Sequence, residues 1–176
     1  GGAGSFTVIG DVDPIGDICS SSKRIQVTMG GRNIGDLLNA ANVSWGWFEE
    51  GFDVTAVNPN GTTGCAREHT SAVTGVASRD YIAHHEPFQY YPSTANPAHV
   101  RPSSVAMIGK RGDAANHQYD LADFFAAVDA GNFPSVVFLK PAAYQNGHAG
   151  YSDPIDEQAF LVRVLNDLQP RPEWKS

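Results

Sequence analysis

The clearest pattern of hydrophobic and polar positions lies in the second half of the chain, where a helical rhythm gives way to a short apolar run. A helix is predicted from Tyr119 or Asp120 to Ala130, followed by Gly131 as a C-terminal stop. Its apolar stripe consists of Leu121, Phe124, Phe125 and Val128. The run Ser135–Leu139, bounded by prolines, predicts a strand that is covered on both faces in a parallel sheet. Helix followed by strand indicates an α/β fold.

A second helix is predicted from Asp156 to about Gln169, after a loop at residues 140–154. The residues expected on its buried side are Phe160, Leu161, Val164, Leu165 and Leu168. Pro170 and Pro172 end this helix where the alternation of helices and strands requires another strand. We therefore expect residues 1–176 to be a single partial domain, the central segment of a larger one.

The first half of the chain has weaker patterns. Short strands are predicted at Phe6–Ile9, Arg24–Met29 and Ser44–Phe48. Between the last two, Asn33 is a plausible N-cap for a helix through Asn39, whose apolar face would consist of Ile34, Leu37 and Leu38. Residues 49–118 are rich in turn-forming residues and are predicted to be a loop-rich excursion, in which 86–91 form at most one helical turn.

Composition narrows the classes of function. The 12 Lys and Arg against 19 Asp and Glu give a net charge of −7, and the basic residues form no cluster, which argues against nucleic acid binding. A hydrophobic content of 41% in 176 residues is enough for a packed core. Since no apolar run reaches the roughly 18 residues that span a bilayer, we expect no transmembrane segment.

Histidines on loops are the main candidates for chemistry. His148 follows the predicted strand that ends at Leu139, and ligands of parallel α/β sheets bind beyond the carboxyl ends of strands. His84 and His85 are adjacent, and in extended backbone neighbouring side chains point to opposite sides, so only one of them is expected to face a given site. From the residues alone, each histidine could equally be a surface or structural residue.

Other kinds of site fit less well. A serine hydrolase at Ser152 would need glycine two residues later, where Pro154 stands. A zinc site could be built from Cys65, His69 and His84 or His85, but it would rest on a single Cys–His pair. The aspartates of residues 11–17 lack the terminal Glu of an EF-hand loop, and roles in turns and helix caps explain their presence better. The two cysteines, Cys19 and Cys65, could be reduced and buried or could form a disulfide.

Taken together in this order, six segments resemble the bacterial phosphoesterase family that contains phospholipases C and an acid phosphatase. The segments are Asp11–Pro14, Asn33–Leu38, Trp45–Phe48, His84–Phe88, Ala142–Pro154 and Asp156–Gln158. The resemblance implies an α/β fold that is part of an alkaline-phosphatase-like α/β/α sandwich with long irregular loops. It also implies a mechanism in which Ser or Thr attacks phosphorus beside a divalent metal.

The resemblance assigns catalytic roles at the phosphate site to His85 and His148, with His84 and Asp153 as possible neighbours. It favours a Cys19–Cys65 disulfide and a secreted or periplasmic location. The nucleophile and the metal ligands of the family lie outside this chain, so no metal is expected within it. The residues by themselves are therefore expected to hydrolyse nothing.

The substrate implied for the intact protein is a phosphate ester or a phospholipid. If these residues are only part of a sandwich, apolar surface that the rest of the domain would cover is exposed. Self-association of the segment is then plausible. The rival class is a noncatalytic module whose loops and aromatic residues bind a ligand or a protein partner.

Overall fold

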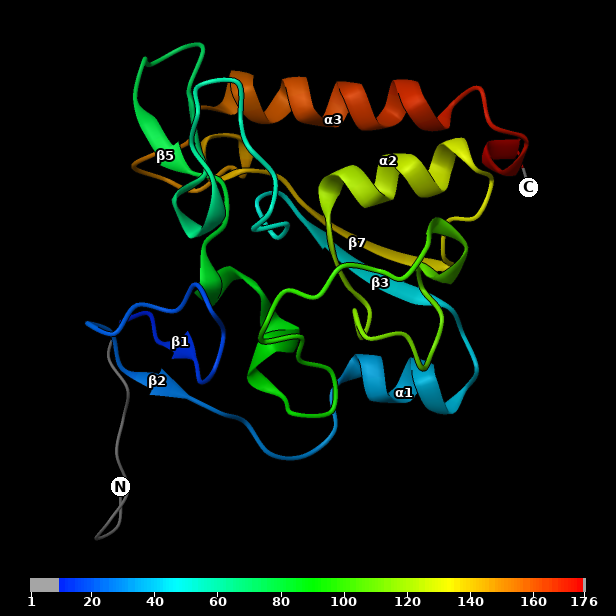
Figure 1. The fold of residues 1–176 in the computed structure, drawn as a ribbon. Helices are drawn as coiled ribbons and strands as arrows, with labels where there is room; N and C mark the ends of the chain where they lie inside the picture. Colours follow the sequence, from blue (N-terminus) through cyan, green and yellow to red (C-terminus); the bar gives the residue numbers. More distant parts are fainter. Residues whose placement is uncertain (1–9, 176) are drawn as a thin grey trace, which may run out of the picture.

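A three-stranded parallel sheet forms the centre of the fold (Figure 1). The computed structural model describes residues 10–175, so the strand predicted at Phe6–Ile9 lies outside the described residues. The central strand β3 (Trp45–Glu49) pairs with β6 (Gln118–Asp120) on one side and with β7 (Val136–Lys140) on the other. The three strands are parallel, so their carboxyl ends lie at one edge of the sheet.

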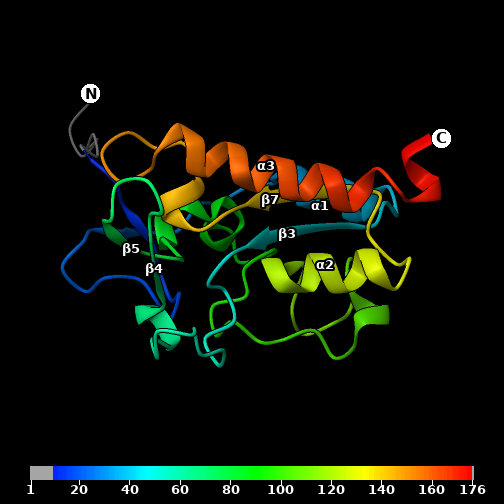
Figure 2. The same cartoon turned by 90° about the horizontal axis from the view of Figure 1, so that it is seen from above.

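Helices cover both faces of this sheet. In Figure 1, α2 (Leu121–Asp129) and α3 (Pro154–Leu168) lie on one side of β3 and β7, and α1 (Ile34–Ala40) lies on the other. Seen from above, α3 and α2 run along the sheet with β7 and β3 between them in the view (Figure 2). The α/β class predicted from the sequence is therefore confirmed.

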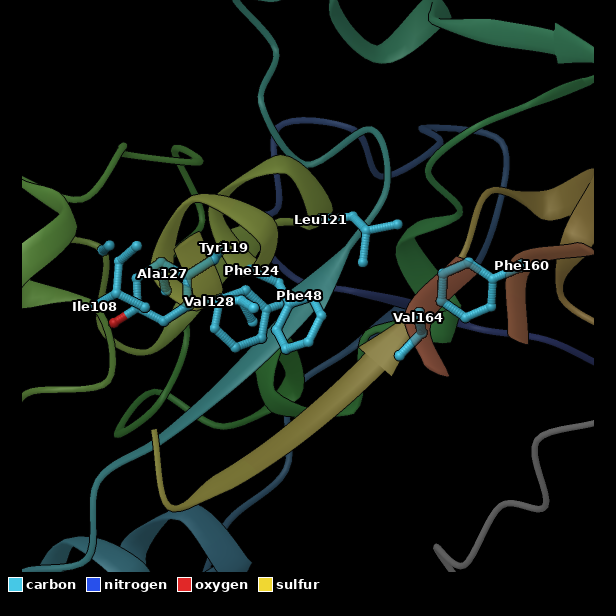
Figure 3. Packing of buried hydrophobic residues seen from close by; sticks show 10 residues of the cluster. Phe48, Ile108, Tyr119, Leu121, Phe124, Ala127, Val128, Phe160 and Val164 are labelled. Atoms are coloured by element: carbon cyan, nitrogen blue, oxygen red, sulfur yellow. The ribbon is translucent and has the colours of Figure 1, made fainter. Parts of the chain in front are cut away.

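The main core lies between the sheet and helices α2 and α3 (Figure 3). Phe48, from the central strand, stacks on Tyr119 with ring centroids 5.0 Å apart and meets Phe124 edge-on at 5.7 Å. Phe160 and Val164 of α3 close the same cluster. Since side chains alternate along a strand, Trp45 points to the opposite face, where it packs on Gly35 of α1.

Helix α1 begins as predicted, but the residues of its predicted apolar face do not make its close contact with Trp45 of the sheet. Asn33 is the N-cap, and its side-chain oxygen accepts a hydrogen bond from the Asp36 N–H at 3.2 Å. Ile34 and Leu37 are about half exposed. The close contact runs instead through Gly35, because only a residue without Cβ lets the helix backbone approach the Trp45 ring.

Helix α3 differs from its prediction in its start and in its buried face. It begins at Pro154, and Asp153 caps it by accepting a hydrogen bond from the Ile155 N–H at 2.8 Å. The prediction that Leu161 and Leu165 are buried is wrong, since they are 51% and 43% exposed. The helix contacts the core through residues spaced four positions apart, which form a narrow stripe. Residues beside that stripe face outward.

The strands show two further differences from the sequence prediction. β7 was predicted to be covered on both faces, yet all its residues are only half-buried, because it pairs with β3 alone among the described strands. β6 was missed because its three fully buried residues, Gln118–Asp120, are not an apolar run. Asp120 ends this strand and also caps α2, so the predicted start of that helix is correct to within one residue.

Between β3 and β6 the chain forms an antiparallel pair, β4 (Glu68–Thr70) with β5 (Ala77–Arg79), and several short 3-10 turns. The turn at Pro87–Tyr90 confirms the prediction of at most one helical turn there. Before β3, two-residue strands β1 (Asp13–Pro14) and β2 (Gln26–Val27) pair in parallel, so the strand expected at 24–29 is shorter than predicted.

A disulfide joins Cys19 to Cys65 across a sequence separation of 46 residues. This pairing confirms the expected disulfide and rules out Cys65 as a ligand of the zinc site considered from the sequence. In the chain-entropy model, closing a loop of this size stabilises the fold by about 4 kcal/mol. Among the described residues, no helix has the length and apolar character needed to cross a bilayer.

Truncating the core residue Phe124 should test this packing. Phe124 of α2 is 2% exposed and packs on Phe48 of the sheet, so we expect Phe124→Ala to lower the free energy of unfolding by about 3–5 kcal/mol. The matched control is Leu161→Ala on the outer side of α3, for which we expect a loss of less than about 1 kcal/mol. Urea denaturation of both variants measures the difference, and equal losses would contradict the core assignment.

Candidate functional site

Three histidines meet beside the carboxyl edge of the sheet. A 3-10 turn, Ala83–His85, carries two of them, and the loop after β7 carries His148. The ring centroids of His84 and His85 are 4.7 Å apart, and those of His85 and His148 are 5.9 Å apart. A 3-10 turn replaces the extended backbone assumed for His84 and His85, and of the two only His84 is on the wall of a cavity described below.

Tyr151 holds two of these rings together. It stacks on His148 with centroids 4.6 Å apart, and its hydroxyl lies 3.4 Å from His85 Nε2. His148 Nδ1 lies 2.7 Å from the Ala149 carbonyl oxygen, which can only accept, so Nδ1 carries a proton. His148 is exposed, and its Nε2 is the ring nitrogen left to meet a ligand.

His84 differs from the other two because acidic side chains face both its nitrogens. Its Nδ1 lies 3.2 Å from Asp13 Oδ1, and its Nε2 lies 3.7 Å from Asp11 Oδ2. The Asp13 side chain is 4% exposed, whereas that of Asp11 is 66% exposed. The first contact is therefore a sheltered one and the second is open to solvent.

Two cavities adjoin this cluster. One has a volume of about 340 Å³, and its wall includes two histidines, two arginines and two acids: His84, His148, Arg24, Arg79, Asp11 and Asp13. The other, of about 420 Å³, is mainly apolar and is lined by Asp11, Val12, Met29, His84, Pro87, Tyr90 and Tyr91. Asp11 and His84 belong to both walls, so the ring of His84 stands between a polar and an apolar space.

The environment of His85 favours its neutral form. Burial, together with the charge of Lys140 and of the two neighbouring histidines, lowers the pKa of His85 to about 4, although Asp11 opposes the shift. At neutral pH, the unliganded ring is therefore an uncharged imidazole. A bound anion would act in the opposite direction, because its negative charge stabilises the imidazolium.

Below the histidines, a buried carboxylate joins several loops. Asp17 accepts hydrogen bonds from the Cys19 N–H at 2.7 Å, from the Tyr81 hydroxyl at 2.6 Å and from Gln89 Nε2 at 2.8 Å. Its fourth partner is His99, whose Nε2 lies 3.1 Å away. Burial alone would raise the pKa of Asp17, but the hydrogen bonds and charge of His99, with those of Tyr81 and Cys19, bring it below the ordinary value.

Both ring nitrogens of His99 face oxygen atoms that can accept a hydrogen bond. Its Nδ1 lies 2.9 Å from the Phe52 carbonyl oxygen, which can only accept a hydrogen bond. Its Nε2 faces the ionised Asp17, which also accepts. The result is a buried contact between side chains that are 0% and 1% exposed, and it ties residues near the N-terminus to the segment that follows β3.

Two further buried acids lie near Asp17. Burial raises the pKa of Glu49, at the end of β3, to about 8, although the Trp47 indole N–H donates to its carboxyl at 2.9 Å. Burial and repulsion from Glu49 raise the pKa of Glu86 well above its ordinary value. Both groups are therefore largely protonated at neutral pH, which lets them occupy the interior without two unpaired charges.

A second buried charge network lies where β3 and β6 end. Arg67, 6% exposed, donates to Glu50 at 2.7 Å and to Asp120 at 3.1 Å, and its Nε lies 3.7 Å from Asp80. Asp80 also contacts His69 Nδ1 at 2.6 Å. One guanidinium thus compensates several carboxylates that the parallel strands bring together.

The described residues do not fit a divalent metal site. Among residues 10–175, one group has the required spacing of ligand atoms, namely Asp17, Cys19 and His99. Cys19 is in the disulfide, and the other two are already paired with each other. These three residues are therefore not available as a set of metal ligands.

The sequence predicted some members of this site and missed others. His85 and His148 lie together, and His84 adjoins them. Asp153 is not on the wall of either cavity, and its side chain caps α3. Asp13, Tyr151 and Arg79 were missed as site residues. Asp13 meets His84 across 71 positions and the Tyr151 hydroxyl meets His85 across 66, whereas Arg79 lines the polar cavity.

These features define an α/β protein with a histidine cluster at the carboxyl edge of a parallel sheet. The chain belongs to the Phosphoesterase family, whose model matches residues 5–176. At the level of the family, its function is that of a phosphoric ester hydrolase. No curated protein shows a significant match to the chain.

The buried acids make the stability of the fold depend on pH. Glu49 and Glu50, whose pKa burial raises to about 8 and about 7, bind protons in the folded state that the unfolded state has already released. His85 and His117 have lowered pKa values and act in the opposite direction, but only below about pH 6.5. Stability should therefore fall as the pH rises from 6.5 to 8.

Glu49→Gln should flatten this dependence, because the amide keeps an oxygen for the Trp47 indole and does not titrate. The slope should decrease by up to about 1.4 kcal/mol per pH unit, the effect of one proton. Urea denaturation at several pH values between 6.5 and 8 measures it, with Glu68→Gln as the control on β4. Equal slopes in wild type and Glu49→Gln would contradict a raised pKa at this carboxyl.

Proposed function

We propose that this chain is a segment of a secreted or periplasmic phosphoesterase of the phospholipase C and acid phosphatase type, and that His85 and His148 bind the phosphoryl group of the substrate. The observation that carries the proposal is the 5.9 Å separation of the two rings, which come from segments more than 60 residues apart. Two imidazoles at this spacing can each reach a different oxygen of one phosphate group.

The chemistry of phosphoryl transfer suits such a pair. Catalysis depends mainly on positioning the phosphoryl group and on stabilising the charge spread over its oxygens. His148 offers Nε2 from an exposed loop, and His85 presents a half-buried ring beside it. Burial lowers the pKa of His85, and the negative charge of a bound phosphate would raise it again. Substrate binding would therefore favour the imidazolium, which donates to a phosphate oxygen.

The remaining catalytic groups are proposed to lie outside this chain. By resemblance to the family, a Ser or Thr nucleophile and the ligands of a divalent metal are supplied by other parts of the protein. When bound, such a metal would stabilise charge on the phosphate oxygens. We therefore propose that residues 1–176 alone are inactive, and metal-dependent hydrolysis of p-nitrophenyl phosphate by them would contradict this.

The proposed location is supported by the Cys19–Cys65 disulfide, since such bonds persist mainly in oxidising compartments. The proposed fold, a part of an alkaline-phosphatase-like sandwich, is supported by a parallel sheet with helices on both faces. Cell fractionation of the producing organism, followed by detection of the protein, would test the location.

Removing either histidine should impair the full-length protein encoded by the gene. We expect His85→Ala and His148→Ala each to lower kcat/KM for a phosphate ester by on the order of 100-fold, because each removes a ligand of the phosphoryl oxygens. Thermal unfolding should change little for His148→Ala, since that side chain is exposed.

The control for these variants is His69→Ala, which lies on β4 away from both cavities. It should retain near-normal turnover. Ordinary activity in both His85→Ala and His148→Ala would remove the assignment. Binding of inorganic phosphate without any turnover by the full-length protein would instead favour a noncatalytic binding module.

A further inference from the structure

We propose that Asp13 and His84 form a carboxylate–histidine dyad in which Asp13 is a positioning residue and His84 donates a proton to the leaving group of the phosphate ester. This inference rests on the proposed function and assigns a role to a ring that lies beside the phosphate-binding pair. It begins from the sheltered contact between Asp13 Oδ1 and His84 Nδ1 at 3.2 Å.

Asp13 is held firmly enough to orient a neighbour. Its second carboxylate oxygen accepts a hydrogen bond from the Ser21 N–H at 2.7 Å, and its own N–H donates to the Ile25 carbonyl at 2.9 Å. It lies on β1, and its side chain is almost fully buried. A carboxylate fixed in this way keeps the proton of a neutral histidine on Nδ1 and sets the orientation of its ring.

The location of His84 suits a proton donor to the leaving group. Its ring lies edge-on to His85 at 4.7 Å, next to the proposed phosphoryl site, and it borders both cavities. The leaving group of an ester must lie to one side of the phosphoryl group, and these cavities adjoin it. Within residues 10–175, the polar group in contact with His84 Nε2 is the exposed Asp11 carboxylate at 3.7 Å, so a leaving oxygen can reach this nitrogen.

The other two histidines are less suited to this step. Burial keeps His85 neutral, and the Tyr151 hydroxyl lies beside its Nε2. For His148, the nearest hydrogen-bonding group to Nδ1 is its neighbouring backbone carbonyl rather than a carboxylate. Within the described residues, acidic side chains contact both ring nitrogens of His84, whereas none contacts a ring nitrogen of His85 or His148.

The bond between phosphorus and the leaving oxygen breaks as the oxygen of the attacking hydroxyl bonds to phosphorus, and the proton of that hydroxyl passes to a base. The rest of the protein supplies both the hydroxyl and this base. The proton on His84 Nε2 passes to the leaving oxygen, and the imidazolium becomes a neutral imidazole that keeps its Nδ1 proton toward Asp13. Water then attacks phosphorus, and the bond between phosphorus and the enzyme oxygen breaks. One proton of the water passes to His84 Nε2, and the base returns its proton to the enzyme oxygen.

Several charged or titratable groups surround this ring and set its electrostatic environment. They are Asp11 and Asp13 from the N-terminal loop and β1, Arg24 before β2, His85 from the same turn, Arg79 from β5, Tyr90 and Tyr91 after the turn, and His148 and Tyr151 from the loop after β7. Arg24 lies 3.9 Å from both Asp11 and Asp13. It therefore limits the net negative charge that the two acids place around His84.

Asp13→Asn in the full-length protein tests the dyad through the choice of leaving group. An alkyl ester needs a proton donor for its alkoxide, whereas p-nitrophenolate leaves as a stable anion. We expect kcat for an alkyl phosphate ester to fall on the order of 10- to 100-fold, and kcat for the p-nitrophenyl ester to fall less than about threefold. The control is Asp167→Asn on α3, which should change neither rate. Equal losses for both esters, or no loss, would overturn the proposal.

A second measurement does not depend on turnover. Ring ¹⁵N shifts of His84 in the folded protein should place the proton of the neutral ring on Nδ1, and this preference should weaken or reverse in Asp13→Asn but persist in Asp167→Asn. An unchanged tautomer in Asp13→Asn would overturn the dyad. If wild type hydrolyses neither ester, the proposed function fails, and the ¹⁵N shifts alone decide whether Asp13 controls His84.

Discussion

The buried pair of Asp17 and His99 determines how the loop half of this protein is organised. The longer helices and strands belong to the central sheet and its covering layers. The walls of the histidine site consist mainly of loops and short turns, which few backbone hydrogen bonds of regular structure hold in place. Asp17 holds these loops together, because its side chain joins the N-terminal loop to Tyr81, Gln89 and His99 in one hydrogen-bonded cluster. An ionised group at this depth is tolerated because its partners satisfy it.

The sequence predicted the parts of the fold whose side chains follow a regular period. Helix α2 and strands β3 and β7 were found because their apolar residues recur at helical spacing or form a continuous run. The strand Gln118–Asp120 was missed because two of its three residues are polar, although all three are buried. Its polar side chains are buried through contacts with distant loops, which no local pattern reveals.

The same reason limits what could be predicted about the site. His85 and His148 were found from their positions in loops and from a resemblance to a family. The contact between Asp13 and His84 joins residues 71 positions apart, and the turn that carries the two adjacent histidines has no regular period. Such contacts depend on the tertiary fold, so a sequence predicts the residue types of a site more readily than their partners.

The disulfide has a consequence for the motions of the cavity wall. Cys19 lies on that wall, and Cys65 lies in the turn that precedes β4. Segments of a folded protein open locally as cooperative units whose contacts determine the free energy of opening. A covalent link between these two loops prevents either from separating alone, so fluctuations that widen the cavity must carry both loops as one body. Movement of this part of the cavity wall is thereby shared between two segments that are remote in the chain.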